Sequence, residues 1–288
     1  MVAGNETPGA AAAGTWALGE LEVRRIGFGA MRITGRGVWG EPASPEGARR
    51  VLRRAVELGV NLIDTADSYG PEVSERLIAE ALHPYPDDLV IATKGGFTRR
   101  GPGSWRADGR PAHLRHACEG SLRRLRLERI DLYQLHTVDP RVPLAESVGA
   151  LAELQGEGKI RHIGLSNVDV DQLASAREIA PVVSVQNRYS VAERDSEAVV
   201  ERCEGDGLAF LPYFPLVAGW VTENSGPWQR IARAKGASVA QVALAWLLRR
   251  SPAIVPIPGT SSVHHLEENV ASAQLKLGDE ELGTLAAG

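Results

Sequence analysis

The chain has 288 residues, of which 43% are hydrophobic and 24% are charged, and its formal net charge is -4. This length allows one large domain or two small ones with a sizeable core. The mild negative charge gives no electrostatic reason to expect nucleic acid or a membrane surface as a partner. The two cysteines, Cys118 and Cys203, lack the spacing of a zinc site or a disulfide framework, so we expect no metal.

Residues 1–14 differ in composition from the rest of the chain, because they hold glycine, proline and an alanine run. They have no basic start and no apolar centre, so they match a signal peptide poorly. No run of the chain reaches the roughly 20 apolar residues that cross a bilayer. We therefore predict a flexible tail over 1–14, a single domain over 15–288 and a cytoplasmic location.

After this tail, strand-like and helix-like patterns alternate. Apolar stretches on either side of residues 19–21 predict a small β-hairpin. The expected strands after the hairpin are short runs rich in Val, Ile and Leu, at residues 26–29, 62–64, 89–93, 130–135, 161–165, 182–186, 208–211 and 253–257. The expected helices carry apolar residues at helical spacing, at residues 45–58, 72–82, 111–126, 144–155, 169–179, 195–205 and 238–250.

Eight strands alternating with helices match a (β/α)₈ TIM barrel of about 250 residues, preceded here by an N-terminal β-hairpin. The rival α/β fold is an open doubly wound sheet, which usually carries a glycine-rich turn after its first strand. Residues 27–32 lack the third glycine of that turn and open no helix. The chain also lacks a phosphate-binding loop that ends in Lys-Ser or Lys-Thr. The barrel is therefore the predicted fold.

Four polar side chains lie at the ends of these expected strands or just beyond them. Asp64 ends the second strand, and Tyr69 lies on the loop after it. Lys94 follows the third strand and His136 follows the fourth. Because the carboxyl ends of barrel strands meet at one mouth, we expect these four side chains to converge.

An acid, a phenol, an amine and an imidazole at one point suggest proton transfer to a carbonyl oxygen. A free tyrosine has a pKa of about 10, and a nearby ammonium lowers that pKa. We expect Lys94 to lower the pKa of Tyr69 and Asp64 to hold Lys94 in place and charged. His136 would orient the substrate oxygen or assist Tyr69. No side chain supplies a hydride, so a nicotinamide cofactor is its simplest source.

Each of the four residues also has a structural explanation when it is taken alone. Asp64 could cap a turn, and Tyr69 could pack a loop. Lys94 could be a solvated charge, and His136 could be a hydrogen-bonded structural histidine. Their ordered placement near strand ends favours the catalytic interpretation. A Schiff-base role for Lys94 is a further alternative, but a carboxylate beside the amine would keep it charged.

The chain resembles the aldo-keto reductase superfamily. Its sequence is more similar to the bacterial branches of that family than to the aldose-reductase branch. The resemblance is carried by ordered segments at residues 59–70, 91–95, 129–136, 158–167, 257–262 and 266–269. It implies a TIM barrel that binds NADPH across its mouth and reduces a small-molecule aldehyde or ketone to the alcohol. It also implies that Tyr69 is the proton donor and that the protein is a monomer. The alternative is a non-catalytic, cofactor-binding regulatory subunit of the same fold.

The resemblance also implies which residues hold the cofactor. Ser166, Asn167 and Gln186 would hydrogen-bond the nicotinamide carboxamide, and Tyr213 would stack on its ring. The other expected contacts lie along the barrel mouth and toward the adenosine half, at Gly29, Met31, Pro215, Leu216, Gly259, Thr260, Ser261, Ser262, His265, Glu268 and Asn269. Small residues that enter a helix also form an anion site without any family argument, which supports phosphate binding at 259–262.

His265 departs from the pattern of many relatives, which carry arginine at the corresponding position. A neutral histidine is a weaker partner for a phosphate dianion than arginine is. We therefore expect NADPH as the cofactor, with weak selectivity against NADH.

A long loop follows the third expected strand and carries aromatic residues that could line a substrate pocket. Phe97 and Trp105 lie on this loop, and Trp39 and Trp220 are further candidates. An aromatic wall suits a medium-sized polar or aromatic carbonyl compound. The same residues could instead pack the loops. A pyridoxal-like aldehyde, a keto sugar and a polyketide ketone remain open as substrates.

Overall fold

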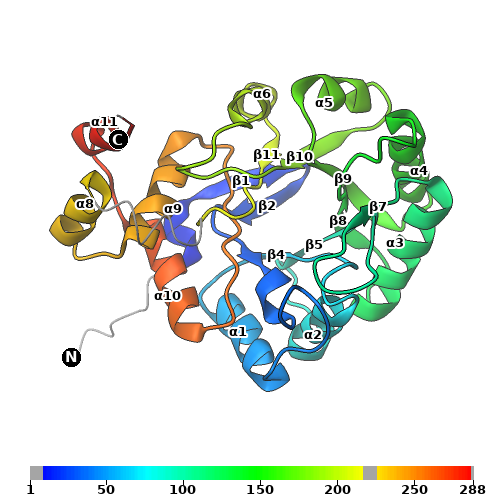
Figure 1. Ribbon diagram of the computed structural model, residues 1–288, viewed down its shortest axis with the longest axis horizontal. Coiled ribbons are helices and arrows are strands. Elements are labelled where there is room, and N and C mark those ends of the chain that lie inside the picture. Colours follow the sequence, from blue (N-terminus) through cyan, green and yellow to red (C-terminus); the bar gives the residue numbers. More distant parts are fainter. Residues whose placement is uncertain (1–8, 217–225, 287–288) are drawn as a thin grey trace.

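The computed structural model describes residues 9–216 and 226–286. Its centre is a curled sheet of seven parallel strands in the order β11-β10-β9-β8-β5-β4-β3 (Figure 1). These strands are β3 (Phe28–Gly29), β4 (Leu62–Asp64), β5 (Val90–Gly95), β8 (Ile130–Leu135), β9 (Ile160–Ser166), β10 (Val182–Gln186) and β11 (Ala209–Phe210). All seven coincide with predicted strands.

The eighth expected strand, 253–257, is an extended segment instead of a regular strand. It lies between the first and last strands of the sheet, since Val255 N donates to Phe210 O at 2.8 Å and Gly27 N donates to Pro256 O at 3.0 Å. Prolines at 256 and 258 have no N–H to donate, which prevents a continuous ladder. The segment nevertheless closes the ring, so the fold is the predicted (β/α)₈ barrel.

Helices cover the outside of the ring (Figure 1). They are α1 (Pro45–Glu57), α2 (Val73–Leu82), α3 (Pro111–Leu125), α4 (Leu144–Gly156), α5 (Val170–Arg177), α6 (Glu197–Asp206), α8 (Pro227–Lys235), α9 (Val239–Arg250), α10 (Val263–Ala271) and α11 (Asp279–Ala286). All seven predicted helices are present. The short helix α8 was not predicted, because its buried apolar side consists only of Trp228, Ile231 and Ala232.

Helix α1 illustrates how the local sequence specifies these elements. The Ser44 hydroxyl accepts a hydrogen bond from Gly47 N at 3.0 Å, and Pro45 takes the first helical position. The buried residues of α1 recur at helical spacing and pack against the strands, at Ala48, Val51, Leu52 and Ala55. The helix ends before Gly59, whose φ of 79° is left-handed.

The predicted hairpin, β1 (Thr15–Leu18) and β2 (Leu21–Arg24), covers the end of the barrel where the strands begin. Leu18 and Val23 pack inside the ring in one cluster with strand residues. Asn61, which precedes β4, accepts from Arg24 N at 2.7 Å and donates to Glu22 O at 3.0 Å. The carboxyl ends of the strands therefore form the open mouth.

The predicted flexible tail, 1–14, is corrected over its second half. A short 3-10 helix, η1 (Ala10–Ala13), packs on the barrel, and Ala10 is completely buried. Ala10 N donates to Leu58 O at 2.9 Å, and Arg25 N donates to Gly14 O at the same distance. The small alanine side chains permit this close packing. Residues 1–8 lie outside the described part of the chain. The other 3-10 helices are η2 (Ala30–Ile33) and η3 (Ser272–Gln274).

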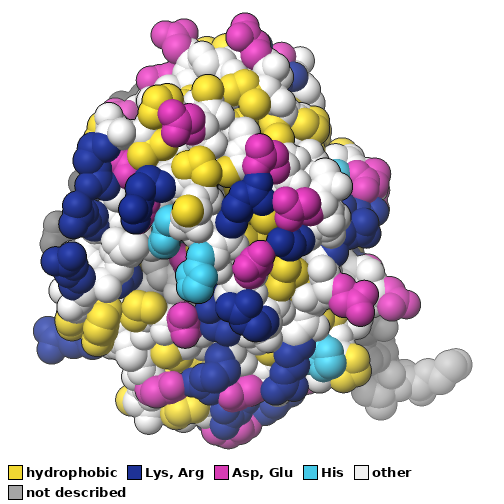
Figure 2. Space-filling model, turned by 90° about the vertical axis from the view of Figure 1, so that its right-hand side faces the viewer, with side chains coloured by type: hydrophobic (Ala, Val, Ile, Leu, Met, Phe, Trp, Pro, Cys, Tyr) yellow, Lys and Arg dark blue, Asp and Glu magenta, His cyan; other side chains and the backbone are white. Residues whose placement is uncertain are grey.

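The molecular surface mixes charges of both signs. Figure 2 shows a face on which basic side chains lie beside acidic ones over much of the area. Ion pairs between neighbouring elements are frequent. For example, Arg115 on α3 pairs with Glu157 at 2.8 Å, and Lys159 pairs with Glu119 at 2.8 Å. In the described ranges, no helix is both long and apolar enough to span a bilayer.

Arg25 joins the start of the barrel to its last segment, so replacing Arg25 tests how much this closure contributes to stability. Its guanidinium donates to Leu248 O and Ser251 O, both at 2.6 Å, and to Ile254 O at 3.3 Å. Arg25→Ala should lower the free energy of unfolding by about 3 kcal/mol, because three carbonyls lose charged donors. Urea denaturation measures this loss. The matched control is exposed Arg53, which pairs with Glu46 on the surface, and its replacement by alanine should change stability by less than about 0.5 kcal/mol.

Candidate active site

The strand registers bring the predicted catalytic residues together at the mouth. Asp64, the last residue of β4, lies opposite Ala92 of β5, and Lys94 of β5 lies opposite Gln134 of β8. His136 directly follows β8, and its backbone N donates to Gly95 O at 2.9 Å. Successive strands therefore present these side chains to one space, as their positions in the sequence predict.

A buried ion pair lies at the floor of this space. Lys94 Nζ donates to Asp64 Oδ1 at 2.6 Å and to Thr65 O at 2.8 Å. Lys94 is 0% exposed and Asp64 is 2% exposed. Burial lowers the pKa of Lys94, and the charge of Asp64 opposes this shift.

Two amides complete the shell around Asp64. Gln134 Nε2 and Gln186 Nε2 both donate to Asp64 Oδ2, at 3.0 and 2.8 Å. Gln186 was predicted as a cofactor contact, whereas Gln134 was not assigned a role. Gln134 lies two residues before His136 on β8 and so points to the same side of the strand. That spacing is the sequence signal that could have identified it.

Tyr69 is buried above the ion pair. Its ring centroid lies 5.2 Å from Lys94 Nζ and 5.8 Å from the ring centroid of His136. Burial, reinforced by the charge of Asp64, raises the pKa of Tyr69 well above its ordinary value. The pKa of Tyr69 is therefore raised and not lowered as expected, because burial and the charge of Asp64 decide the direction of the shift. The phenol keeps its proton at neutral pH.

His136 is neutral in the same environment. Burial lowers the pKa of His136 well below its ordinary value, and the positive charges of Lys94 and Arg99 add to the effect. Its Nδ1 lies 3.4 Å from Ser68 Oγ.

A cavity of about 580 Å³ opens beside Tyr69 and His136. The predicted site residues that line it are Gly29, Met31, Asp64, Tyr69, Phe97, Trp105, His136, Ser166, Asn167, Gln186, Tyr213, Leu216 and Gly259. The lining also includes Arg32 and five residues that were not predicted to face the site, which are Val38, Thr137, Phe214, Ile257 and Pro258. Most of these additional residues are next in the sequence to a predicted site residue. That proximity was the only indication in the sequence that they face the cavity.

The wall after β9 forms a hydrogen-bonded group. Asn167 has a left-handed φ of 58° and donates through Nδ2 to His136 O at 2.9 Å and to Ser166 Oγ at 3.1 Å. Tyr213 OH donates to Asn167 Oδ1 at 2.8 Å. The polar side chains expected to contact a cofactor are thus tied directly to the loop that carries His136.

Glycine is required where the first strand meets the closing segment. A Cβ on Gly29 would lie 2.6 Å from Ile257 O, and a Cβ on Gly259 would lie 2.5 Å from Gly29 O. Ser262 caps α10 by accepting from His265 N at 3.4 Å. This cap brings the phosphate-binding candidates to a helix N-terminus beside the cavity.

Several predicted residues do not line the cavity. Lys94 is completely buried, with its Nζ 5.2 Å from the ring centroid of Tyr69, and Trp39 is not among the lining residues. The others lie along the approach to α10 or on it, or precede Leu216: Pro215, Thr260, Ser261, Ser262, His265, Glu268 and Asn269. Trp220 lies outside the described residues. No cluster of His, Cys, Asp or Glu suited to a metal ion is found in the described chain.

The profile of the Aldo/keto reductase family matches residues 25–287. The chain belongs to this family. It is 47% identical to pyridoxine 4-dehydrogenase of Escherichia coli, covering 94% of this chain and 96% of that one. It is 48% identical to an uncharacterized oxidoreductase of Schizosaccharomyces pombe, covering 96% and 90%. An aldo-keto reductase from Klebsiella pneumoniae, solved in complex with NADPH, is 30% identical with a TM-score of 0.81, covering 95% and 94%.

This aldo/keto reductase also has a buried carboxyl group close to its catalytic candidates. Asp67 lies two residues before Tyr69, and its backbone N donates to Lys94 O at 3.3 Å. Asp67 Oδ1 is buried without a hydrogen-bond partner in the described chain. Burial, with the charge of Glu75, raises the pKa of Asp67 to about 8, and Arg124 opposes the shift.

Replacing Asp67 by asparagine should change how the reductase's stability depends on pH. Between the ordinary pKa and about 8, folded Asp67 holds a proton that the unfolded chain has released. Wild-type stability from this residue is therefore lost as the pH rises through this window. Asp67→Asn does not titrate, so its free energy of unfolding should increase relative to that of wild type from pH 4 to pH 9. Denaturant midpoints measured across that range would contradict this if the difference stayed constant.

Proposed function

We propose that this aldo/keto reductase uses NADPH to reduce an aromatic aldehyde to its alcohol, with Tyr69 as the proton donor. Members of the family are oxidoreductases that act on small-molecule carbonyl compounds. The observation that carries the proposal is the Lys94–Asp64 pair, buried beneath a protonated Tyr69 at the wall of a 580 Å³ cavity.

In the proposed mechanism, each of the four catalytic candidates has a different task. Lys94 has three N–H groups and donates two of them to Asp64 and Thr65, which leaves one for the phenol oxygen. When the substrate oxygen gains negative charge, Tyr69 gives up its proton and Lys94 stabilises the phenolate. Neutral His136 donates a hydrogen bond that orients the carbonyl oxygen.

The residues present fit a nicotinamide cofactor. Ser166, Asn167 and Gln186 supply polar groups at the cavity wall, and Tyr213 supplies an aromatic surface. The N-terminus of α10 lies beyond Gly259 and suits the phosphate of the adenosine half. When bound, NADPH supplies the hydride to the carbonyl carbon.

The cavity wall favours a planar aromatic substrate over a keto sugar. Around Tyr69 and His136, the wall is formed by the rings of Phe97 and Trp105, with Met31 and Val38 nearby. These side chains have little capacity to satisfy a row of sugar hydroxyls. The relative that is 47% identical is a pyridoxine 4-dehydrogenase, which makes pyridoxal our preferred substrate.

Tyr69→Phe should lower the rate of NADPH oxidation with pyridoxal by about a thousandfold, because it removes only the proton donor. The change should leave NADPH affinity intact, since the phenyl ring remains. The rate is measured from NADPH absorbance, and tryptophan fluorescence reports binding.

Full turnover by Tyr69→Phe would overturn the assigned mechanism. Tight NADPH binding by wild type without turnover of pyridoxal or any other carbonyl compound would instead support the non-catalytic regulatory alternative. Turnover of aliphatic ketones alone would overturn only the substrate assignment.

His265 offers a test of the phosphate site. Its side chain is exposed in the first turn of α10. His265→Arg should tighten NADPH binding about tenfold, because a charged guanidinium pairs with the phosphate that NADH lacks. NADH affinity should stay unchanged.

The neighbouring His264→Arg serves as a matched control, since His264 turns toward Glu268 at 3.8 Å. Titrations of both cofactors measure the two affinities. Equal tightening by both variants would indicate general charge attraction instead of a specific site.

A further inference from the structure

We propose that Arg99 is the residue that fixes the substrate wall of this cavity and thereby sets affinity for aromatic aldehydes. This inference rests on the proposed function, since it concerns the same cavity. Arg99 follows β6 (Phe97–Thr98), which pairs antiparallel with β7 (Arg106–Ala107) to form a hairpin at the barrel mouth. The guanidinium is a positioning group that acts through its neighbours.

Arg99 donates to three backbone carbonyls on three different loops. Its Nη1 donates to Ser68 O at 2.9 Å, its Nε to Ser104 O at 2.8 Å and its Nη2 to Gly37 O at 3.2 Å. Each carbonyl belongs to the residue directly before one that lines the cavity, and these lining residues are Val38, Tyr69 and Trp105. One planar fork therefore holds three parts of the wall at fixed separations.

The same guanidinium also supports the indole of Trp105. Arg99 Cζ lies 3.6 Å from the centroid of that ring and 5.7 Å from the centroid of Trp39. Trp105 in turn makes edge-to-face contacts with Tyr69, at 6.3 Å, and with Phe97, at 5.5 Å. Trp39 was expected to line the pocket, but it is not among the lining residues, and its ring instead lies near the guanidinium of Arg99.

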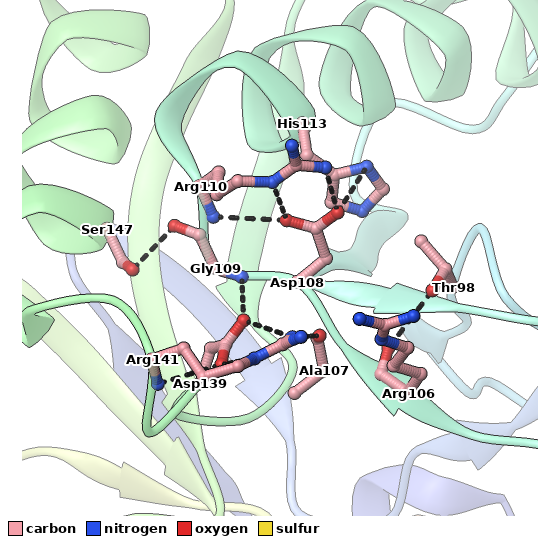
Figure 3. Close-up of polar contacts among 10 residues, drawn as sticks. All are labelled: Thr98, Arg106, Ala107, Asp108, Gly109, Arg110, His113, Asp139, Arg141 and Ser147. Carbon is pink, nitrogen blue, oxygen red and sulfur yellow. Dashed lines mark hydrogen bonds and ion pairs between the residues drawn. The ribbon is translucent and has the colours of Figure 1, made fainter.

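The base of the hairpin is fixed independently of Arg99. Asp139 accepts from Gly109 N at 3.2 Å and pairs with Arg141, which also donates to Ala107 O (Figure 3). Asp108 pairs with Arg110 at 2.6 Å in the same view. Loss of Arg99 would therefore loosen the turn that carries Trp105 while the hairpin itself persists.

Tyr69 is less dependent on Arg99 than Trp105 is. Tyr69 N donates to Ala66 O at 3.2 Å, and Ser74 N donates to Tyr69 O at 3.1 Å. Trp105, by contrast, is 37% exposed. Removing Arg99 should therefore weaken substrate binding more than it slows the chemical step.

The test compares Arg99→Ala, Arg99→Lys and Arg100→Ala with wild type, using NADPH and pyridoxal or 4-nitrobenzaldehyde. Arg99→Ala should raise KM about tenfold, with kcat changed by less than about threefold and NADPH affinity unchanged. Arg99→Lys should recover little, because one ammonium cannot reach three carbonyls. Arg100 is exposed and has no side-chain partner in the described chain, so Arg100→Ala should match wild type.

A double-mutant cycle with Trp105→Ala separates positioning from general loosening. If Arg99 acts through Trp105, removing Arg99 from the Trp105→Ala enzyme should raise KM by less than about twofold. Additive effects, or an unchanged KM in folded Arg99→Ala and Arg99→Lys, would overturn the inference. Absence of carbonyl reduction by wild type would instead overturn the proposed function. Circular dichroism establishes that each variant is folded.

Discussion

The ion pair between Lys94 and Asp64 is buried away from water, and the positions of the neighbouring side chains depend on it. Buried charges are tolerated only when they are matched and hydrogen-bonded. Asp64 meets this condition with Lys94 on one oxygen and the amides of Gln134 and Gln186 on the other. These four side chains come from β4, β5, β8 and β10, so one polar centre ties together strands from half of the ring. In the proposed mechanism, the contacts that hold the barrel mouth in shape also position Lys94 beneath Tyr69, the proposed proton donor.

Residue pattern was sufficient for the strands, the main helices and the convergence of Asp64, Tyr69, Lys94 and His136, because barrel topology turns chain order into spatial order. It failed where the outcome depended on a balance of forces. Burial, followed by the charge of Asp64, raises the pKa of Tyr69, and neither the burial nor the distance between these groups can be measured in a sequence. The packing of Ala10 likewise depends on tertiary contacts, which override local propensity. The irregular eighth strand, by contrast, follows from Pro256 and Pro258, which the sequence shows.

The substrate wall shows a different limit of sequence reasoning. Phe97 and Trp105 could be proposed as lining because they are aromatic residues on a long loop after β5. Arg99, between them, carries no comparable signal in a chain rich in arginine. Its importance emerges only when its three carbonyl acceptors are traced to separate loops. Residues that organise a pocket from behind its surface are therefore harder to predict than residues that face it.

The closing segment of the barrel has a thermodynamic consequence. Gly29 belongs to the first strand and Gly259 comes after the last extended segment, and both line the cavity. This seam is joined by few backbone hydrogen bonds, because the prolines there donate none. A ligand lying on both glycines spans the seam and links the two ends of the barrel chain. For the proposed cofactor in this position, binding energy would add to the free energy of unfolding, so the stability of the closed ring would rise with the cofactor concentration.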